Sequence, residues 1–384
     1  MMNVDIALLI LFISAILIFI IIWTIFSQKK RAAQPDPYLE ALEYLADGDD
    51  HSAMEKFKEA IRQNSNNIGA YLRLGDRLRE QGFTKNALRI HKELTLRENL
   101  TKEDELRINK SLLFDYEKNK DFENGISIAK RISQEDKSSE KWIIKQLIEF
   151  YEKAEKWNDA IEIIRKNFKP FGSDHKHKIS LYLVFQGLHL HTINKAREGR
   201  IKFKEALKLD PSCSAAYFYL GKSYQNERRI EDAIREWQNF CRKIPKKAHI
   251  VFPYLEKAYF DKGIFEDIES FYEELIDLDE KNINTVLALV AFYVKKGKYD
   301  KAHILLEKAK EDFADSPQLA AKKIQVLFHI NQHKEAAKEA SQLFKIANKE
   351  TSQNYVCTVC NFESKDPLWR CPECKNIDSF SFSK

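Results

Sequence analysis

The sequence predicts an all-α protein built from helical repeats, with a helix that spans a membrane at its N-terminus and a small metal-binding segment at its C-terminus. The 384 residues include only 11 glycines and 9 prolines, too few for a fold rich in β-hairpins. Four of the six cysteines fall between residues 357 and 374, whereas a disulfide scaffold would spread them along the chain. The formal net charge of +5 is small for this length and gives no indication of nucleic-acid binding.

Residues 4–26 read VDIALLILFISAILIFIIIWTIF, in which Asp5 is the only charged residue. About 20 apolar residues suffice for a helix to cross the hydrocarbon core of a bilayer. A cleaved signal peptide would carry basic residues before its apolar stretch, but here the basic residues, 29–31, follow it. The positive-inside rule therefore predicts a single-pass protein whose bulk faces the cytoplasm. Residues 27–36 are predicted to be a basic juxtamembrane linker.

The middle of the chain repeats itself every 34 residues. The first copy of the clearest pair contains Gly187, Phe203 and Pro211, and the second contains Gly221, Trp237 and Pro245. This is the tetratricopeptide pattern, in which a small residue lets two helices cross closely, a ring fills the space beside it and a proline ends the second helix. We predict about nine units between residues 37 and 347, stacked into a superhelix.

Arrays of this kind bind proteins through their inner surface and carry no reacting groups by virtue of their fold. No Ser/His/Asp, His/Glu or phosphate-loop pattern occurs, so an enzyme is not predicted. The positions expected on the inner face do not form a regular basic clamp for a peptide carboxylate; they are Arg79, Phe218, Lys222, Lys257, Phe260 and Lys295.

The remaining metal-ligand residue types offer weaker alternatives. His189 and His191 lie two apart on a predicted helix and should point away from each other. His175 and His177 lie in a predicted loop and could converge on a metal. The single cysteines, Cys213 and Cys241, are expected to be small buried apolar residues.

The C-terminal segment 354–382 contains two Cys-x-x-Cys turns separated by ten residues, with the thiols of Cys357, Cys360, Cys371 and Cys374. Two such turns can place four thiolates at the corners of a tetrahedron, the geometry of a closed structural zinc site. A segment this short cannot bury enough apolar surface to fold alone, so metal binding would supply the folding energy. Zinc is favoured, and iron remains open because tetrahedral sulfur suits both metals.

The order of membrane helix, tetratricopeptide repeats and terminal ribbon resembles the lipopolysaccharide assembly protein B family. Two stretches of the ribbon carry the resemblance, Tyr355-x-Cys357-x-x-Cys360-x-Phe362 and Trp369-x-Cys371-Pro372-x-Cys374. The rubredoxin-like ribbons of the family usually have glycine after each cysteine pair, where this chain has Asn361 and Lys375. Asparagine tolerates the left-handed backbone of such turns better than lysine does.

The resemblance implies a non-enzymatic scaffold in the inner membrane of a Gram-negative bacterium, with its ribbon packed against its repeats. It also implies regulation of lipopolysaccharide synthesis, by presenting the deacetylase of the lipid A pathway to a membrane AAA protease. Two alternatives stay open: a general membrane-anchored assembly scaffold for envelope-biogenesis enzymes, and an electron-transfer protein with an iron-loaded ribbon. The oligomeric state is also open, with a homodimer among the options.

Overall fold

The computed structural model describes residues 16–24, 36–135, 140–168, 172–279, 281–313, 316–346 and 355–382. They form two compact units, divided between Ala154 and Glu155. The helices of the first unit are α2 (Pro37–Ala46), α3 (Asp50–Gln63), α4 (Ile68–Glu80), α5 (Thr84–Leu94), α6 (Lys102–Lys118), α7 (Phe122–Glu135) and α8 (Glu140–Lys153).

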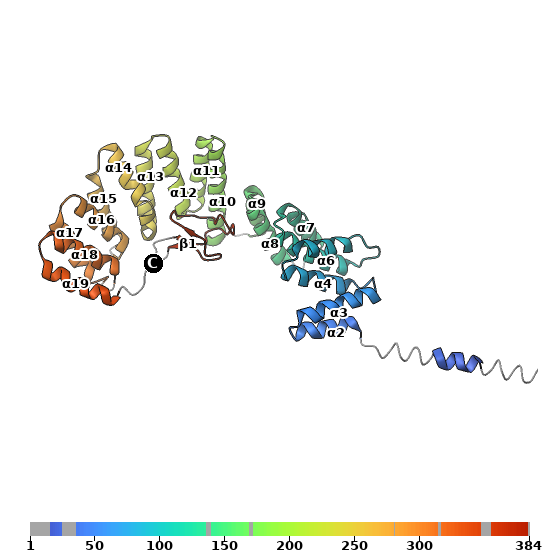
Figure 1. Ribbon diagram of the computed structural model, residues 1–384. Coiled ribbons are helices and arrows are strands. Elements are labelled where there is room, and N and C mark those ends of the chain that lie inside the picture. Colours follow the sequence, from blue (N-terminus) through green and yellow to red (C-terminus); the bar gives the residue numbers. More distant parts are fainter. Residues whose placement is uncertain are drawn as a thin grey trace, which may run out of the picture. The chain divides into compact units, whose positions relative to one another are not determined.

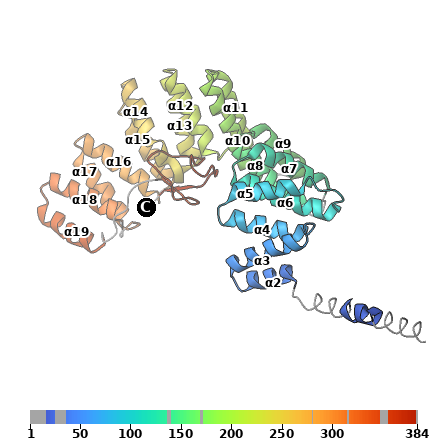
Figure 2. The ribbon, with the colours of Figure 1, turned by 45° about the vertical axis from the view of Figure 1, so that its right-hand side comes forward.

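The second unit continues the helices and ends in a small sheet (Figures 1 and 2). Its helices are α9 (Trp157–Asn167), α10 (Ser173–Thr192), α11 (Ala196–Leu209), α12 (Ser214–Asn226), α13 (Ile230–Lys243), the 3₁₀ helix η2 (Pro245–Ile250), α14 (Phe252–Lys262), α15 (Asp267–Leu278), α16 (Ile283–Lys295), α17 (Tyr299–Lys310), α18 (Pro317–His329) and α19 (His333–Ile346). The strands are β1 (Tyr355–Cys357), β2 (Glu363–Ser364) and β3 (Phe380–Phe382), antiparallel and in the order β2-β1-β3. The expectation of an all-α repeat fold with a small C-terminal ribbon is confirmed for the described residues.

Consecutive helices pair as hairpins, and each hairpin turns through a residue with a left-handed backbone. Four of these residues are glycines, and the others are Lys120, Asn194, Arg228 and Asn331; Glu155, between α8 and α9, is left-handed as well. The spacing of the repeats along the sequence is less regular near the middle of the chain, because the first helix of two hairpins is longer there. Helices α6 and α10 have 17 and 20 residues, against 13 in α4 and α12.

The close helix crossings predicted from the repeat pattern occur as expected. A Cβ added at Gly221 would overlap the indole of Trp237, and one at Gly187 would overlap the ring of Phe203. Both rings are fully buried. Glycine is therefore required at these two positions because the ring of the second helix occupies the volume that any side chain would need.

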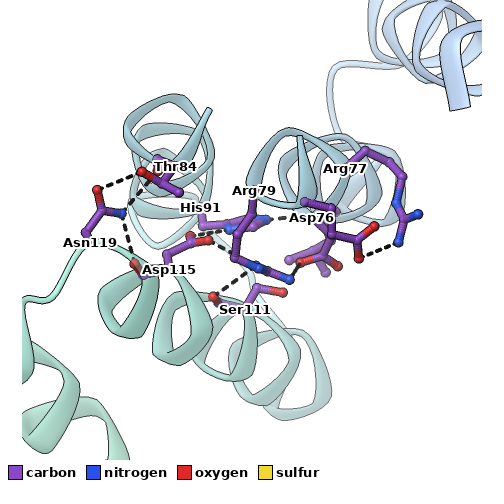
Figure 3. Close-up of polar contacts among 10 residues, drawn as sticks. Asp76, Arg77, Arg79, Thr84, His91, Ser111, Asp115 and Asn119 are labelled. Carbon is purple, nitrogen blue, oxygen red and sulfur yellow. Dashed lines mark hydrogen bonds and ion pairs between the residues drawn. The ribbon is translucent and has the colours of Figure 1, made fainter. Parts of the chain in front are cut away.

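A buried polar network joins α4, α5 and α6 in the first unit (Figure 3). The His91 and Asp115 side chains are both fully buried, with His91 Nδ1 2.6 Å from Asp115 Oδ2. Arg79 also reaches this carboxylate, with Nη1 3.0 Å from Asp115 Oδ1, and pairs with Asp76 at 2.7 Å. Arg79, which the sequence placed on the inner face, therefore holds two helices together and is largely buried.

The predicted membrane helix falls mostly outside the described residues. Residues 16–24 are helical and their apolar side chains are exposed. Within the described part of the chain, none of the helices combines the length and the apolar character needed to cross a bilayer. The transmembrane helix over residues 4–26 thus stays a prediction, as does the linker that follows it.

Candidate metal centre and the ribbon interface

Two equivalent turns build the ribbon around its cysteines. The Asn361 amide donates to the Cys357 carbonyl oxygen at 2.9 Å, and the Lys375 amide donates to the Cys371 carbonyl oxygen at 3.1 Å. Asn361 and Lys375 both have left-handed backbones, with φ of 58° and 62°. The sequence-based expectation for these two positions is therefore met, although lysine has a Cβ that disfavours this conformation.

The turns bring the four thiols together. The Sγ atoms of Cys357, Cys360, Cys371 and Cys374 all lie within 4.8 Å of one another. Two pairs of sulfur atoms from opposite turns lie 3.7 Å apart, between Cys357 and Cys374, and 3.5 Å apart, between Cys360 and Cys371. A tetrahedral zinc with Zn–S bonds of ~2.3 Å needs S–S edges of about 3.8 Å. The ribbon could therefore bind a metal ion, and the donor set fits zinc or iron.

Local hydrogen bonds favour thiolates at two of these positions. Burial alone would raise the pKa of the Cys357 thiol, but hydrogen bonds from Ser379 and from backbone amides lower it to about 6. In the same way, Asn376 lowers the pKa of Cys374 against the effect of burial. The backbone amide of Phe362 lowers the pKa of Cys360, but desolvation and the contacts with the other thiols outweigh it and raise this pKa to about 12. A bound metal cation would displace the thiol protons that remain.

The ribbon packs against the repeats through Trp369. This indole is almost fully buried and donates from Nε1 to Ser214 Oγ at 3.1 Å. Its ring centroid lies 5.3 Å from that of Phe218 and 5.6 Å from that of Tyr219, on α12. Phe218 is consequently buried beneath the ribbon, so it is not available to a partner as an inner-face residue would be. Figures 1 and 2 both show the ribbon beside this part of the array.

Arg370 makes a second contact between the ribbon and the repeats. Its Nη1 donates to Glu155 Oε1 at 2.6 Å, and its guanidinium carbon lies 5.0 Å from the centroid of the Trp157 ring. A guanidinium over an aromatic face is held by the ring quadrupole as well as by its ion pair. The next residue, Cys371, is one of the four clustered cysteines, so this contact is tied directly to the metal centre.

A third contact uses His177, which the sequence placed in a loop. Helix α10 begins at Ser173, so His177 lies in its first two turns and not in a loop. Its Nδ1 is 2.6 Å from Asp210 Oδ2, and its Nε2 is 3.2 Å from Asp378 Oδ2 of the ribbon. Hydrogen bonding to Asp378, and further to Asp210, raises the pKa of His177 to about 9 despite its burial. His177 is thus a cation that bridges two carboxylates.

Of the other sequence-predicted candidates, two histidines pack on aromatic rings, two cysteines are buried, and His189 is exposed. His175 stacks on Phe168, with centroids 4.6 Å apart, and His191 stacks on Phe203 at 5.5 Å. Cys213 and Cys241 are fully buried, and burial raises the pKa of both thiols. The sequence analysis named Trp369 as part of the ribbon motif but gave it no contact, because its partner Ser214 lies far away in the chain.

Two family models match the chain. One, described as "Rubredoxin metal binding domain", matches residues 355–381, which contain all four clustered cysteines. The other, described as "Tetratricopeptide repeat", matches residues 259–325. Among solved structures, the MamA protein aligns with a TM-score of 0.31 and 19% identity over 45% of this chain and 92% of that one, a score too low to add to the argument.

Curated relatives align with nearly the whole chain. "Lipopolysaccharide assembly protein B" of Haemophilus influenzae is 22% identical over 363 residues, which cover 89% of this chain and 88% of that protein. The protein of the same name from Escherichia coli K12 is 18% identical over 342 residues, which cover 88% and 87%. These relatives and the repeat fold indicate a non-enzymatic scaffold, as the sequence predicted. These relatives, together with the ribbon model that matches residues 355–381, confirm the resemblance to the lipopolysaccharide assembly protein B family.

Proposed function

We propose that this protein is a scaffold in the inner membrane that regulates lipopolysaccharide synthesis, by presenting the lipid A pathway deacetylase to a membrane AAA protease. The observation that carries the proposal is the alignment with lipopolysaccharide assembly protein B over 89% of the chain. The repeat fold supports the scaffold role because stacked helical hairpins form extended surfaces for protein partners.

In this proposal, residues 4–26 anchor the chain and residues 37–347 form the partner-binding array. A shared membrane raises the effective concentration of scaffold, client and protease, so weak contacts in the array suffice for a stable assembly. The orientation expected from the basic residues after the anchor puts the array in the cytoplasm. Both features are supported by the apolar sequence and by the charges that flank it.

The ribbon, residues 354–382, is proposed to hold a structural zinc through Cys357, Cys360, Cys371 and Cys374. The mutual distances of the thiols support this ligand set. When bound, the metal would supply the folding energy that so short a segment lacks. Metal content is measured on purified protein: zinc without a visible absorption band supports the structural role. A red protein with a reversible one-electron couple would favour electron transfer instead.

The test of the regulatory role is the half-life of the deacetylase in the native host. Depletion of this protein should lengthen the half-life, and the wild-type gene should restore it. A form without residues 1–31 should fail to restore it. Cys371→Ser should fail as well, because we expect this substitution to unfold the ribbon and to leave the repeats folded. An unchanged half-life on depletion would refute the link to proteolysis and leave the general assembly scaffold as the better account.

A further inference from the structure

Two side chains that follow the second cysteine turn reach two of the clustered sulfur atoms. Ser379 Oγ lies 3.2 Å from Cys357 Sγ, and Asn376 Nδ2 donates to Cys374 Sγ at 3.3 Å. A thiolate has no proton and can only accept, so both side chains are donors once the cysteines are deprotonated to bind a cation. The segment 376–379 thus supplies one hydrogen bond to a sulfur of each turn.

The two donors differ in their surroundings. The Ser379 side chain is buried, and its hydroxyl proton could also reach the Asn376 carbonyl oxygen at 3.4 Å. That carbonyl already accepts from the Cys371 amide at the shorter distance of 2.8 Å, which leaves the hydroxyl to the sulfur. Asn376 is exposed, so water competes with its amide for the sulfur. The hydrogen bond from Ser379 should therefore contribute more to the metal centre.

The backbone of the segment 376–379 is fixed within the ribbon. The Ser379 carbonyl oxygen accepts from the amide of Thr358, inside the first Cys-x-x-Cys turn, at 2.8 Å. The Asp378 amide donates to the Trp369 carbonyl oxygen at 2.7 Å. Because these two bonds hold adjacent residues, a displacement of Asp378 also moves Ser379 and its hydroxyl.

Helix α10 of the repeats holds Asp378 from outside the ribbon. His177 Nε2 lies 3.2 Å from Asp378 Oδ2, and His177 Nδ1 lies 2.6 Å from Asp210 Oδ2. The backbone of Asp378 is left-handed, with a φ of 50°, a conformation that aspartate visits but does not favour. A side chain anchored at its carboxylate restricts the backbone that carries it. The repeats therefore help to keep the Ser379 hydroxyl within reach of the sulfur.

We propose that Ser379 and Asn376 are positioning residues of the metal centre, and that His177 of the repeats acts on the metal through them. The docked ribbon holds its metal more tightly than an undocked one, because docking orders the donors to the thiolates. By linkage, the bound metal strengthens docking by the same factor. The inference rests on the four-cysteine site proposed above, and it adds the residues outside the ligand set that control its affinity.

The first test uses the full chain in detergent, loaded with cobalt(II), which accepts the same tetrahedral sulfur ligands as zinc. The energy of the sulfur-to-cobalt charge-transfer band reports the sulfur lone pairs, which a hydrogen bond stabilises. Ser379→Ala should shift this band to longer wavelength, and Ser379→Thr, which keeps a hydroxyl, should retain the wild-type band. Ser381→Ala is the matched control and should leave the band unchanged, because the Ser381 hydroxyl donates to the Val356 carbonyl oxygen.

The second test measures zinc affinity of the full chain by competition with a chelator under reducing conditions. The affinity should fall about tenfold in Ser379→Ala and less in Asn376→Ala. His177→Ala, outside the ribbon, should lower it about fivefold and shift the cobalt band in the same direction as Ser379→Ala. His175→Ala, on the same helix, is the control and should change neither, because His175 stacks on Phe168.

An unshifted cobalt band in either Ser379→Ala or His177→Ala would overturn the proposal, even if zinc affinity fell. The loss of affinity would then reflect only the stability of the ribbon. A zinc affinity within about twofold of the wild type in both variants would overturn it as well. A wild-type protein that binds neither metal would refute the four-cysteine site itself, and the proposal with it.

Discussion

The hairpins α4/α5 and α12/α13 solve the same packing problem with different chemistry. In each, a glycine on the first helix faces a flat ring on the second: Gly75 faces His91, and Gly221 faces Trp237. Both rings are fully buried. A Cβ on either glycine would overlap the ring, so the two crossings have the same shape requirement although one ring is polar and the other largely apolar.

The two rings also make equivalent hydrogen bonds. His91 Nε2 lies 3.2 Å from the Leu72 carbonyl oxygen, and Trp237 Nε1 donates to the Phe218 carbonyl oxygen at 3.3 Å. Each carbonyl lies three residues before the glycine on the first helix. In these two hairpins the ring carries an N–H at one edge, which histidine and tryptophan both provide. Phe203 fills the equivalent position beside Gly187 without an N–H, so the shared requirement is a flat ring.

The two hairpins differ in the residues of the next hairpin that contact the ring. His91 Nδ1 contacts Asp115, which also binds Arg79, whereas the Trp237 ring lies 5.8 Å from the ring of Tyr254. One hairpin is joined to its neighbour by buried charges and the other by aromatic packing. The repeat therefore requires a ring at this position. The contact between the ring and the next hairpin can be made either by buried charges or by aromatic packing.

The largest effect should follow Asp115→Ala. The substitution removes the acceptor of Arg79 and His91 together and leaves buried polar groups without their partner, which costs about 3–5 kcal/mol of unfolding free energy. Hydrogen exchange of the α5 and α6 amides, read against those of α12 and α13, would localise the loss. A loss below about 1 kcal/mol would mean that the network contributes little, and that shape alone stabilises this hairpin.

A smaller loss is expected for Trp237→His, which gives α12/α13 the ring of α4/α5. The smaller ring keeps a donor for the Phe218 carbonyl but leaves a void beside Tyr254. Among the hydrogen bonds that the structure describes for the two rings, Trp237 has no counterpart of the buried His91–Asp115 contact. We expect a loss of roughly 2–3 kcal/mol, measured by urea denaturation with exchange as the local probe. A neutral result would contradict the view that the neighbouring contact is matched to the ring.

The converse variant, His91→Phe, keeps the ring shape and removes both nitrogens. The Leu72 carbonyl and Asp115 each lose one partner, while Arg79 still neutralises the carboxylate. About 1–3 kcal/mol should be lost, and Asp115→Ala in the same background should cost less than it does in the wild type. Strict additivity of the two substitutions would show that His91 and Asp115 are not coupled.

The smallest effect concerns His177, which has the same pairing with aspartate at a half-exposed site. Its folded pKa of about 9 lies above the reference of 6.5, so its contribution to ribbon docking is complete below the reference and is lost as pH rises through about 9. Tryptophan fluorescence, referenced to Trp369→Phe, should report undocking at alkaline pH. His177→Gln should remove that dependence, and its persistence would assign the effect to another group.

The residues at the helix crossings were predictable where the ring that faces the glycine is also hydrophobic. Gly221 and Trp237 stood out because an indole is recognised as a core residue, and Gly187 with Phe203 repeated the pattern. His91 was missed, although its separation from Gly75 is that of Trp237 from Gly221, because a histidine reads as a surface residue. The useful signal is the spacing between a glycine and any flat ring, whether of histidine, tryptophan or phenylalanine.

The candidate site also has a part that the sequence predicts and a part that it does not. The cysteine cluster depends on two short turns, so its spacing in the sequence carries most of its geometry. The docking of the ribbon depends on pairs such as Trp369 with Ser214 and Asp378 with His177, which no local pattern connects. The start of α10 was also missed, since its polar, histidine-rich first turn resembles a loop until packing selects the helix.

The hydrogen bond between Trp369 and Ser214 joins residues 155 positions apart, in a fold where most contacts are local. Helices α10 to α12 can pack soon after they leave the ribosome, because their partners are close in sequence. Trp369 is synthesised roughly 8 to 30 s later at bacterial rates of elongation. During that interval the surface around Phe218 is uncovered on a nascent chain, so synthesis of the ribbon sets the time at which this aromatic surface is withdrawn from other partners.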